Sequence, residues 1–210
     1  RGGMRSKGFE KLSDEAGCKT LRIDGGYKSI RNHVLDSFTS LREIIIVAGS
    51  TGTGKTSLLH KMKEQKLGVI DLEKLASHRG SAFGDIGLAD QPTQQQFENN
   101  LSSEWQSTDK DQLVFIESES RRIGKLVIPK EIWSQMSSGL YLKLNMDMNR
   151  RIKNLINDYG SHPKDTIEER IHRISKKLGG QQTKIAVELL HENKLTNLCE
   201  LLLNNYYDKM

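Results

Sequence analysis

Residues 49–56 restrict the fold of this chain more than any other segment. They match the phosphate-loop pattern G-x-x-x-x-G-K-[ST] and lie between an apolar run, residues 44–48, and a helix-forming stretch, residues 57–62. Glycines let successive backbone N–H groups approach a phosphate, and the N-terminus of the following helix adds partial positive charge. The order strand, glycine loop, helix therefore predicts an α/β fold that binds a diphosphate or triphosphate group. The predicted phosphate-binding residues of the loop are Gly49, Ser50, Thr51, Gly52, Thr53, Gly54, Lys55 and Thr56.

Three residues are predicted to carry the chemistry of this site. Lys55 can reach the terminal phosphates, and the hydroxyl of Thr56 can bind Mg²⁺. Glu117 follows the apolar residues 113–116, so its carboxylate is expected at the carboxyl end of a strand, where open parallel sheets bind ligands. We therefore predict Lys55, Thr56 and Glu117 as catalytic residues, with Thr56 and Glu117 as metal ligands. The side chain of Glu119, two residues later, is expected to point in the same direction, and Glu119 is the weaker candidate for this role.

Two arginines are further candidates for phosphate contacts. Arg79 lies in the segment H-R-G-S, and Arg121 follows the acidic end of a predicted strand. A guanidinium can pair with two phosphate oxygens at once. Asp71 ends another predicted strand, at the edge of the sheet where ligands bind. Arg79 and Arg121 are therefore added to the predicted phosphate-binding residues.

From residue 43 onward, predicted strands alternate with predicted helices. This order favours a mostly parallel sheet covered by helices, with the first strand inside the sheet. Thr93 is expected to cap a helix together with Gln96, and the glycine-containing segment 76–91 is predicted to be a long functional loop. The strands are expected at residues 43–48, 68–71, 112–117 and 139–145, and the helices at residues 55–65, 93–105 and 130–136.

The two flanks of this region have different patterns. Residues 1–39 are too few to form an independent α/β domain. After residue 146 the strand pattern ends, and apolar residues recur at helical spacing. We therefore predict a three-layer P-loop α/β domain over residues 40–146 and a helical C-terminal region over residues 147–210. In the N-terminal flank we expect a glycine loop at its start, a helix at 6–16, a strand at 20–23 and a helix at 29–37.

Composition adds a small number of constraints. The net charge of +5 is compatible with an anionic partner such as RNA without requiring one. The two cysteines, Cys18 and Cys199, form neither a disulfide framework nor a zinc pattern, which favours a reducing cytoplasm. No apolar run approaches the roughly 20 residues of a membrane span, so we expect no membrane partner.

Several unusual segments are spread along the chain: H-R-G-S-A-F-G at residues 78–84, Q-P-T-Q at 91–94, F-E-N at 97–99, I-E-S-E-S-R at 116–121, I-G at 123–124, I-P at 128–129, L-L at 201–202 and Y-Y-D at 206–208. Together they resemble the tRNA 2-selenouridine synthase family, and the resemblance covers essentially the whole chain. Members of this family have a rhodanese domain, a phosphate-loop domain and a helical C-terminal part, so the resemblance implies that residues 1–39 correspond to the end of a rhodanese-like domain.

The resemblance implies a transferase that acts on the wobble 2-thiouridine of certain tRNAs. The sulfur is first alkylated by geranyl diphosphate, and the S-geranyl group is then displaced by selenium from selenophosphate. The implied partners are tRNA, a small-molecule diphosphate and a selenium donor, with Mg²⁺ as cofactor. The phosphate loop would then hold a diphosphate leaving group, which Lys55, the loop amides and Mg²⁺ would stabilise.

The family also has a glycine-arginine loop in its rhodanese domain, entered through a cysteine in a pattern that resembles C-x-R-G-G-M-R-S. The matching cysteine would lie two residues before the first residue of this chain, and Cys18 lies on the wrong side of the loop to replace it. We therefore expect a fragment that retains the diphosphate-binding and geranylation half of the activity and does not complete selenium transfer. The predicted remnant of the loop is Arg1, Gly2, Gly3, Met4, Arg5 and Ser6.

Two other functions are compatible with the residues alone. A phosphate-loop small-molecule kinase would use the segment 76–91 as an acceptor site or lid. A nucleotide-dependent RNA-binding module would bind tRNA without forming a product. ATP hydrolysis or phosphoryl transfer would favour the kinase, and salt-sensitive tRNA binding without chemistry would favour the module.

Overall fold

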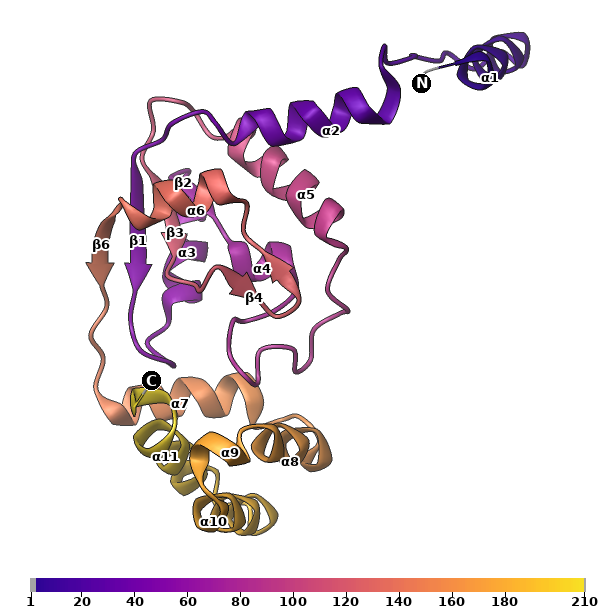
Figure 1. Cartoon of the computed structure of the whole chain (residues 1–210). Coiled ribbons are helices and arrows are strands. Elements are labelled where there is room, and N and C mark those ends of the chain that lie inside the picture. The colour runs from indigo at the N-terminus through magenta and orange to yellow at the C-terminus, as the bar shows by residue number, and fades with distance from the viewer. Residues whose placement is uncertain (1–2, 210) are drawn as a thin grey trace.

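A four-stranded parallel sheet forms the centre of the computed structural model, which describes residues 3–209 (Figure 1). The strand order is β2-β3-β1-β6, so the strand that leads into the phosphate loop is an inner strand, as predicted. Ile46 of this strand pairs with Ile116 on one side and Tyr141 on the other. The strands are β1 (Ile44–Ala48), β2 (Gly68–Ile70), β3 (Val114–Glu117) and β6 (Leu140–Lys143).

Helices cover both faces of the sheet, because successive side chains of its inner strands point to opposite faces. On one face Ile46 and Ile116 belong to a core that includes Trp105, and on the other Val47 packs with Leu59. This is the predicted three-layer α/β arrangement. The helices of the first face are α2 (Gly26–Ser37), α4 (Leu72–Ala76), α5 (Gln94–Ser107) and α6 (Lys130–Ser137), and α3 (Lys55–Glu64) covers the second.

Local hydrogen bonds explain where some of these elements begin. Thr93 Oγ1 accepts a hydrogen bond from the N–H of Gln96 (3.2 Å) and so caps α5. The Gln96 side chain donates to Asn100 instead of returning to the cap, so half of the predicted capping box is formed. A small antiparallel hairpin, β4 (Arg122–Ile123) and β5 (Leu126–Val127), was not predicted, because two-residue strands are too short to leave an alternating pattern.

The C-terminal helices lie beyond the carboxyl ends of the strands (Figure 1). They form a second core, to which Phe83 and Ile86 of the segment after α4 contribute. None of the helices within residues 3–209 is both long and apolar enough to cross a membrane. The C-terminal helices are α7 (Met148–Tyr159), α8 (Lys164–Arg173), α9 (Ser175–Leu178), α10 (Gly180–His191) and α11 (Leu195–Asn205).

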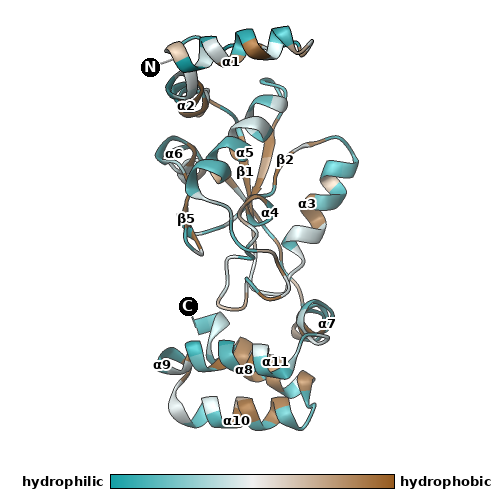
Figure 2. Ribbon diagram, turned by 90° about the vertical axis from the view of Figure 1, so that its right-hand side faces the viewer, coloured by the Kyte–Doolittle hydropathy of each residue, from teal (hydrophilic) through white to brown (hydrophobic). Residues whose placement is uncertain are grey.

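The N-terminal segment differs from its prediction. Helix α1 (Met4–Glu15) lies at the end of the molecule opposite the C-terminal helices, and none of its residues is buried (Figure 2). It begins at Met4, so Met4, Arg5 and Ser6 are helical rather than part of a loop, while Arg1 and Gly2 lie outside the described residues. The strand predicted at residues 20–23 is wrong: these residues are irregular, because no neighbouring strand pairs with them.

Helix α2 packs with the sheet rather than with α1. Its residue Val34 and the following Phe38 are buried in the core on the first face of the sheet. The side chain of Ser37 contacts that of Ser102 on α5 through a 2.8 Å hydrogen bond. Helix α2 therefore packs as part of the α/β domain, although the sequence analysis assigned its residues to the N-terminal flank.

Candidate functional site

The phosphate loop turns sharply between β1 and α3. Gly52 and Gly54 have φ angles of 83° and 77°, in the left-handed region that residues with side chains rarely adopt. A Cβ atom on Gly52 would also lie 2.9 Å from the backbone oxygen of Arg151. The buried Thr53 donates a hydrogen bond to the carbonyl oxygen of Ser50 (2.8 Å), which fixes the turn from within.

Lys55 is the first residue of α3 and points back over the loop. Its Nζ donates a hydrogen bond to the carbonyl oxygen of Gly49 (2.7 Å). Burial lowers the pKa of Lys55, and the nearby carboxylates, chiefly Glu73 and Glu119, oppose that shift. The ammonium group and the N-terminus of α3 together make the loop a site for negatively charged groups.

Acidic side chains gather beside Thr56 at the carboxyl ends of β2 and β3. Thr56 Oγ1 donates a hydrogen bond to Glu73 Oε2 (3.2 Å), and the backbone N–H of Glu73 donates to Glu117 Oε1 (2.7 Å). Within the described residues, the other Glu117 oxygen is buried and has no hydrogen-bond partner. Asp71 does not contact Thr56 in this way. It accepts hydrogen bonds from the ring of His60 and from the backbone N–H of Lys74 in the first turn of α4. We call Asp71, Glu73, Glu117 and Glu119 the carboxylate cluster.

Three carboxylates of this cluster, Glu73, Glu117 and Glu119, have raised pKa values. Burial raises the pKa of Glu117 well above its usual value, and the charges of Asp71 and Glu73 add to the shift. Burial also raises the pKa of Glu119 to about 8, helped by the charge of Glu73 and by a hydrogen bond with it. The pKa of Glu73 is raised as well, mainly by burial. A bound cation would reverse these shifts, because it stabilises the charged carboxylates.

The residues around Thr56 fit a Mg²⁺ ion. Mg²⁺ prefers oxygen ligands and usually takes one or two from the protein, with the remainder from substrate phosphates and water. Thr56, Glu73 and the unpartnered oxygen of Glu117 offer such oxygens next to the loop. Over residues 3–209, no group of three or more His, Cys, Asp or Glu side chains could hold a metal ion. Binding of the ion would therefore depend on the diphosphate.

The C-terminal helices hold the phosphate loop from outside. Arg151 of α7 donates a hydrogen bond from Nε to the carbonyl oxygen of Thr51 (2.8 Å), and Asn154 donates to that of Gly52 (2.8 Å). The buried Arg151 guanidinium also forms two hydrogen bonds with Asp208, at 2.9 and 2.6 Å, in the 3₁₀ helix Tyr207–Lys209. The shape of the loop thus depends on the far end of the described chain.

Comparison with known proteins places this site in a family. The sequence profile of the tRNA 2-selenouridine synthase AAA domain matches residues 42–210. The chain belongs to the tRNA 2-selenouridine synthase family. Three relatives, each named tRNA 2-selenouridine synthase, show the extent of the match.

The relative from Shewanella frigidimarina is 31% identical over 243 positions, which cover 100% of this chain and 65% of that protein. The relative from Sulfurovum sp. is 34% identical with the same coverage. The relative from Pseudomonas putida is 38% identical over 166 positions, which cover 76% of this chain and 44% of that protein. The chain therefore spans about 65% of the length of the first two relatives. No solved structure gives a significant match.

Two of the predicted phosphate-binding residues, both arginines, have no polar contact with the loop in the described part of the chain. The Arg79 guanidinium lies over the ring of Tyr159, 5.3 Å from its centre, and donates a hydrogen bond to the carbonyl oxygen of Ile86 (3.2 Å). Arg121 is exposed. Neither side chain forms a hydrogen bond or ion pair with residues 49–56 in the described part of the chain. Their contact with a bound phosphate stays a prediction.

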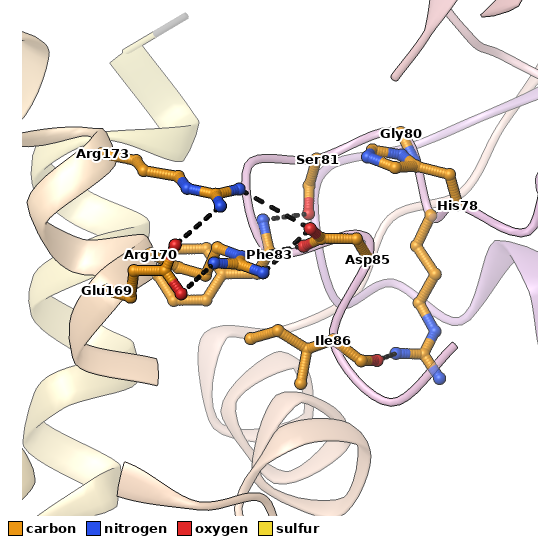
Figure 3. Close-up of polar contacts among 10 residues, drawn as sticks. His78, Gly80, Ser81, Phe83, Asp85, Ile86, Glu169, Arg170 and Arg173 are labelled. Atoms are coloured by element: carbon orange, nitrogen blue, oxygen red, sulfur yellow. Dashed lines mark hydrogen bonds and ion pairs between the residues drawn. The ribbon is translucent and has the colours of Figure 1, made fainter. Parts of the chain in front are cut away.

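The segment that contains Arg79 nevertheless approaches the carboxylate cluster. Gly80 has a φ of 65°, and a Cβ atom there would collide with the carboxylate of Glu119. Further along, Asp85 forms hydrogen bonds of 2.8 and 2.9 Å with Arg170 of α8, as Figure 3 shows. The predicted loop at residues 76–91 is thus a fixed connection between the carboxylate cluster and the C-terminal helices.

Sequence reasoning did not identify several residues of this site. Glu73 lies two residues after Asp71, so the pattern D-x-E after the second strand was an available signal. Arg151 and Asn154 gave no such signal, because their partners are backbone carbonyl groups distant in sequence. Asp208 belongs to the segment Y-Y-D that supported the family resemblance, but that segment did not reveal its role.

The described part of the predicted rhodanese-loop remnant, residues 3–6, is not part of this site. Gly3 precedes α1 and Met4, Arg5 and Ser6 form its first turn. This helix lies at the end of the molecule opposite the C-terminal helices that hold the loop (Figure 2). The structure therefore brings Lys55, Thr56 and Glu117 together and leaves residues 3–6 apart from them.

Proposed function

We propose that this chain carries the diphosphate-dependent half of 2-selenouridine synthesis: transfer of a geranyl group from geranyl diphosphate to the sulfur of wobble 2-thiouridine in tRNA. The observation that carries the proposal is a phosphate loop beside a buried carboxylate, Glu117, with one oxygen unpartnered within the described residues. Family membership and the name shared by the relatives support an enzyme that modifies tRNA.

In the proposed reaction, the sulfur of 2-thiouridine forms a bond to C1 of the geranyl group while the C1–O bond to the diphosphate breaks. The electron pair of that bond leaves with the diphosphate, and the uracil N3 proton is released. Lys55 and the N–H groups of the loop would stabilise the negative charge that develops on the leaving oxygens. Mg²⁺, held by Thr56, Glu73 and Glu117, would supply Lewis-acid stabilisation to the same oxygens.

The second step, displacement of the S-geranyl group by selenium from selenophosphate, is assigned to the full-length enzyme. We propose that residues 1–39 are part of a rhodanese-like domain, because α1 exposes the large apolar side chains of Met4, Phe9 and Leu12. Residues 3–6 have no role in geranyl transfer in this scheme. We place the enzyme in the cytoplasm, together with its tRNA substrate.

A depression of mixed polar and apolar lining between the 76–91 segment and the C-terminal helices is the proposed place for the anticodon. Its lining includes His78, Ser81, Arg173, Lys176 and Tyr206. Cationic side chains there can pair with RNA phosphates. The net charge of +5 agrees with an RNA partner.

Nucleoside mass spectrometry tests this proposal. The chain is incubated with Mg²⁺, geranyl diphosphate and an anticodon stem-loop that contains 2-thiouridine. We expect a geranylated nucleoside with the unchanged chain and a loss of at least about a hundredfold with Lys55→Ala, because an electrostatic contact to the leaving group is removed. Lys61→Ala, an exposed lysine on the same helix, is the matched control.

The outcomes separate the candidate functions. Product that depends on Lys55 and not on Lys61 supports geranyl transfer. Equal product from the Lys55→Ala chain would overturn the role of the loop. ATP turnover without geranylated product would favour the kinase instead, and tRNA binding without either reaction would favour an RNA-binding module.

A further inference from the structure

An apolar cavity lies directly beside the phosphate loop. It is enclosed by α7, α8, α11 and the segment around Phe83, and the empty space between its walls, including the part open to solvent, is about 560 Å³. Leu155, Tyr159 and Leu195 form part of a wall that is almost entirely apolar. One loop residue, Thr51, also lines the cavity, so the two sites are continuous.

Helix α7 connects the loop and the cavity. Its first half holds the loop, through Arg151 to Thr51 and through Asn154 to Gly52. Its second half, including Leu155 and Tyr159, lines the cavity. At a rise of about 1.5 Å per residue, the eight steps from Arg151 to Tyr159 extend about 12 Å away from the loop.

Helix α11 runs along the cavity in the opposite direction. Asp208, just after it, contacts Arg151 near the loop, whereas Leu195 at its start packs near the end of α7. A Cβ atom on Gly160, which follows α7, would lie 3.2 Å from Leu195 Cδ1. Leu195 therefore marks the end of the cavity distant from the loop, and Cys199, one turn later on α11, lies between the two ends.

We propose that this cavity binds the hydrocarbon chain of the diphosphate substrate and limits the length of that chain. The inference rests on the proposed function, because it places the diphosphate at the loop. A ligand with a diphosphate at one end and an apolar chain at the other matches a cationic loop that opens into an apolar cavity. An extended chain advances about 1.2 Å per bond, so about ten bonds fit along 12 Å. Each isoprene unit adds four bonds along the chain, so this length accepts two units, with eight bonds, and is too short for three units, with twelve.

Calorimetric titration in the presence of Mg²⁺ tests the inference on binding alone. The ligands are inorganic pyrophosphate and the dimethylallyl, geranyl and farnesyl diphosphates. Burial of apolar carbons strengthens binding as long as the chain fits. We expect geranyl diphosphate to bind on the order of tenfold or more tightly than dimethylallyl diphosphate, and farnesyl diphosphate to bind more weakly than geranyl diphosphate.

Two variants change the cavity at defined places. Leu195→Ala lengthens the cavity, and we expect it to bind farnesyl diphosphate about tenfold more tightly than the unchanged chain does. Cys199→Phe obstructs the middle, and we expect it to lose the preference for geranyl diphosphate while pyrophosphate binding is retained. Leu201→Ala, a partly buried leucine on the same helix outside the cavity lining, is the matched control. Retained pyrophosphate binding shows that each variant is folded.

The results distinguish failure of the inference from failure of the proposed function. If pyrophosphate binds and depends on Lys55, but all three prenyl diphosphates bind equally tightly, the cavity has no role and the inference is wrong. If farnesyl affinity rises equally in Leu195→Ala and Leu201→Ala, the effect is general loosening and the inference is again wrong. If neither pyrophosphate nor any prenyl diphosphate binds, the proposed function fails and the inference fails with it.

Discussion

The two carboxylate oxygens of Glu117 have different surroundings. One accepts a hydrogen bond from the backbone N–H of Glu73, whereas the other is buried without a partner among the described residues. A buried polar atom without a partner is unfavourable and rare in folded proteins. A cation at this position would satisfy the free oxygen and stabilise the charged form of the carboxylate, whose pKa burial raises well above its usual value.

Glu117→Gln tests the role of this charge. The amide keeps the shape of the side chain and can still accept the hydrogen bond from Glu73, but it cannot ionise. We expect the gain in pyrophosphate affinity that Mg²⁺ confers to fall about tenfold or more. The free energy of unfolding without ligand should stay constant or rise by about 1 kcal/mol at pH 8, because no charge needs to be buried. Calorimetric titration and denaturant unfolding measure the two effects.

Glu64→Gln, at the exposed end of α3, is the control for this prediction. An unchanged dependence of pyrophosphate binding on Mg²⁺ in Glu117→Gln would remove Glu117 from the metal site.

At the scale of single residues the sequence was informative for Lys55, Thr56 and Glu117, because the order of strand, loop and helix brings the ends of parallel strands to one edge. It was less informative for Glu73, which lies on a five-residue helix that has too few residues to show a periodic pattern.

The segment between α4 and α5 is the element that joins the sheet to the C-terminal helices. Phe83 and Ile86 are buried in the helical core, and Asp85 between them pairs with Arg170 (Figure 3). Burial alone would raise the pKa of Asp85, but the hydrogen bond and charge of Arg170 outweigh burial and lower it. Glycines and apolar residues in irregular order predicted a loop here, and its packing partners became visible only in three dimensions.

Asp85→Asn is expected to weaken this connection. The free energy of unfolding should fall by about 1 kcal/mol, a small value because Asp85 is partly exposed and solvent screens the pair. A carboxyl whose pKa is lowered in the folded state stabilises the fold at pH values above its unfolded pKa of 3.8. This stabilisation is lost as the pH falls through the folded pKa. The difference between the two proteins should therefore be constant at neutral pH, begin to decrease below pH of about 4, and disappear once the pH lies below the lowered folded pKa of Asp85.

Denaturant unfolding at a series of pH values measures this difference, with Asp90→Asn in the same segment as the control. A difference that persists unchanged in acid would show that the carboxylate charge is not its cause.

Residues 20–23, which are irregular, show where prediction of an element from its sequence failed. Their local sequence predicts a strand, but a strand requires a hydrogen-bonded neighbour, and local sequence carries no information about whether one is present.

At the scale of the whole molecule, the phosphate loop is enclosed by two units. The sheet and α3 set its path, and the C-terminal helices hold its outer side through Arg151 and Asn154. Asp208 secures Arg151 in this position. The apolar cavity beside Thr51 exists only because the two units meet there.

Asp208→Asn is expected to affect stability and ligand binding together. Arg151 is buried, so loss of its charged partner should lower the free energy of unfolding by about 2 kcal/mol. The carbonyl oxygen of Thr51 would be held less firmly, and pyrophosphate affinity should fall by about threefold to tenfold. Glu200→Gln, an exposed acid on α11, is the control. Unchanged pyrophosphate affinity in a destabilised Asp208→Asn chain would separate the C-terminal helices from the function of the loop.

The sequence by itself determined the three-layer fold, the inner position of β1 and the phosphate loop, because each depends on residues that are adjacent in the chain. An apolar strand, a glycine turn and a helix N-terminus specify their own geometry. The tertiary structure alone decided that α7 holds the loop and that an apolar cavity opens beside it. These features depend on side chains about 100 residues from their partners, and a local sequence pattern carries no information about such contacts.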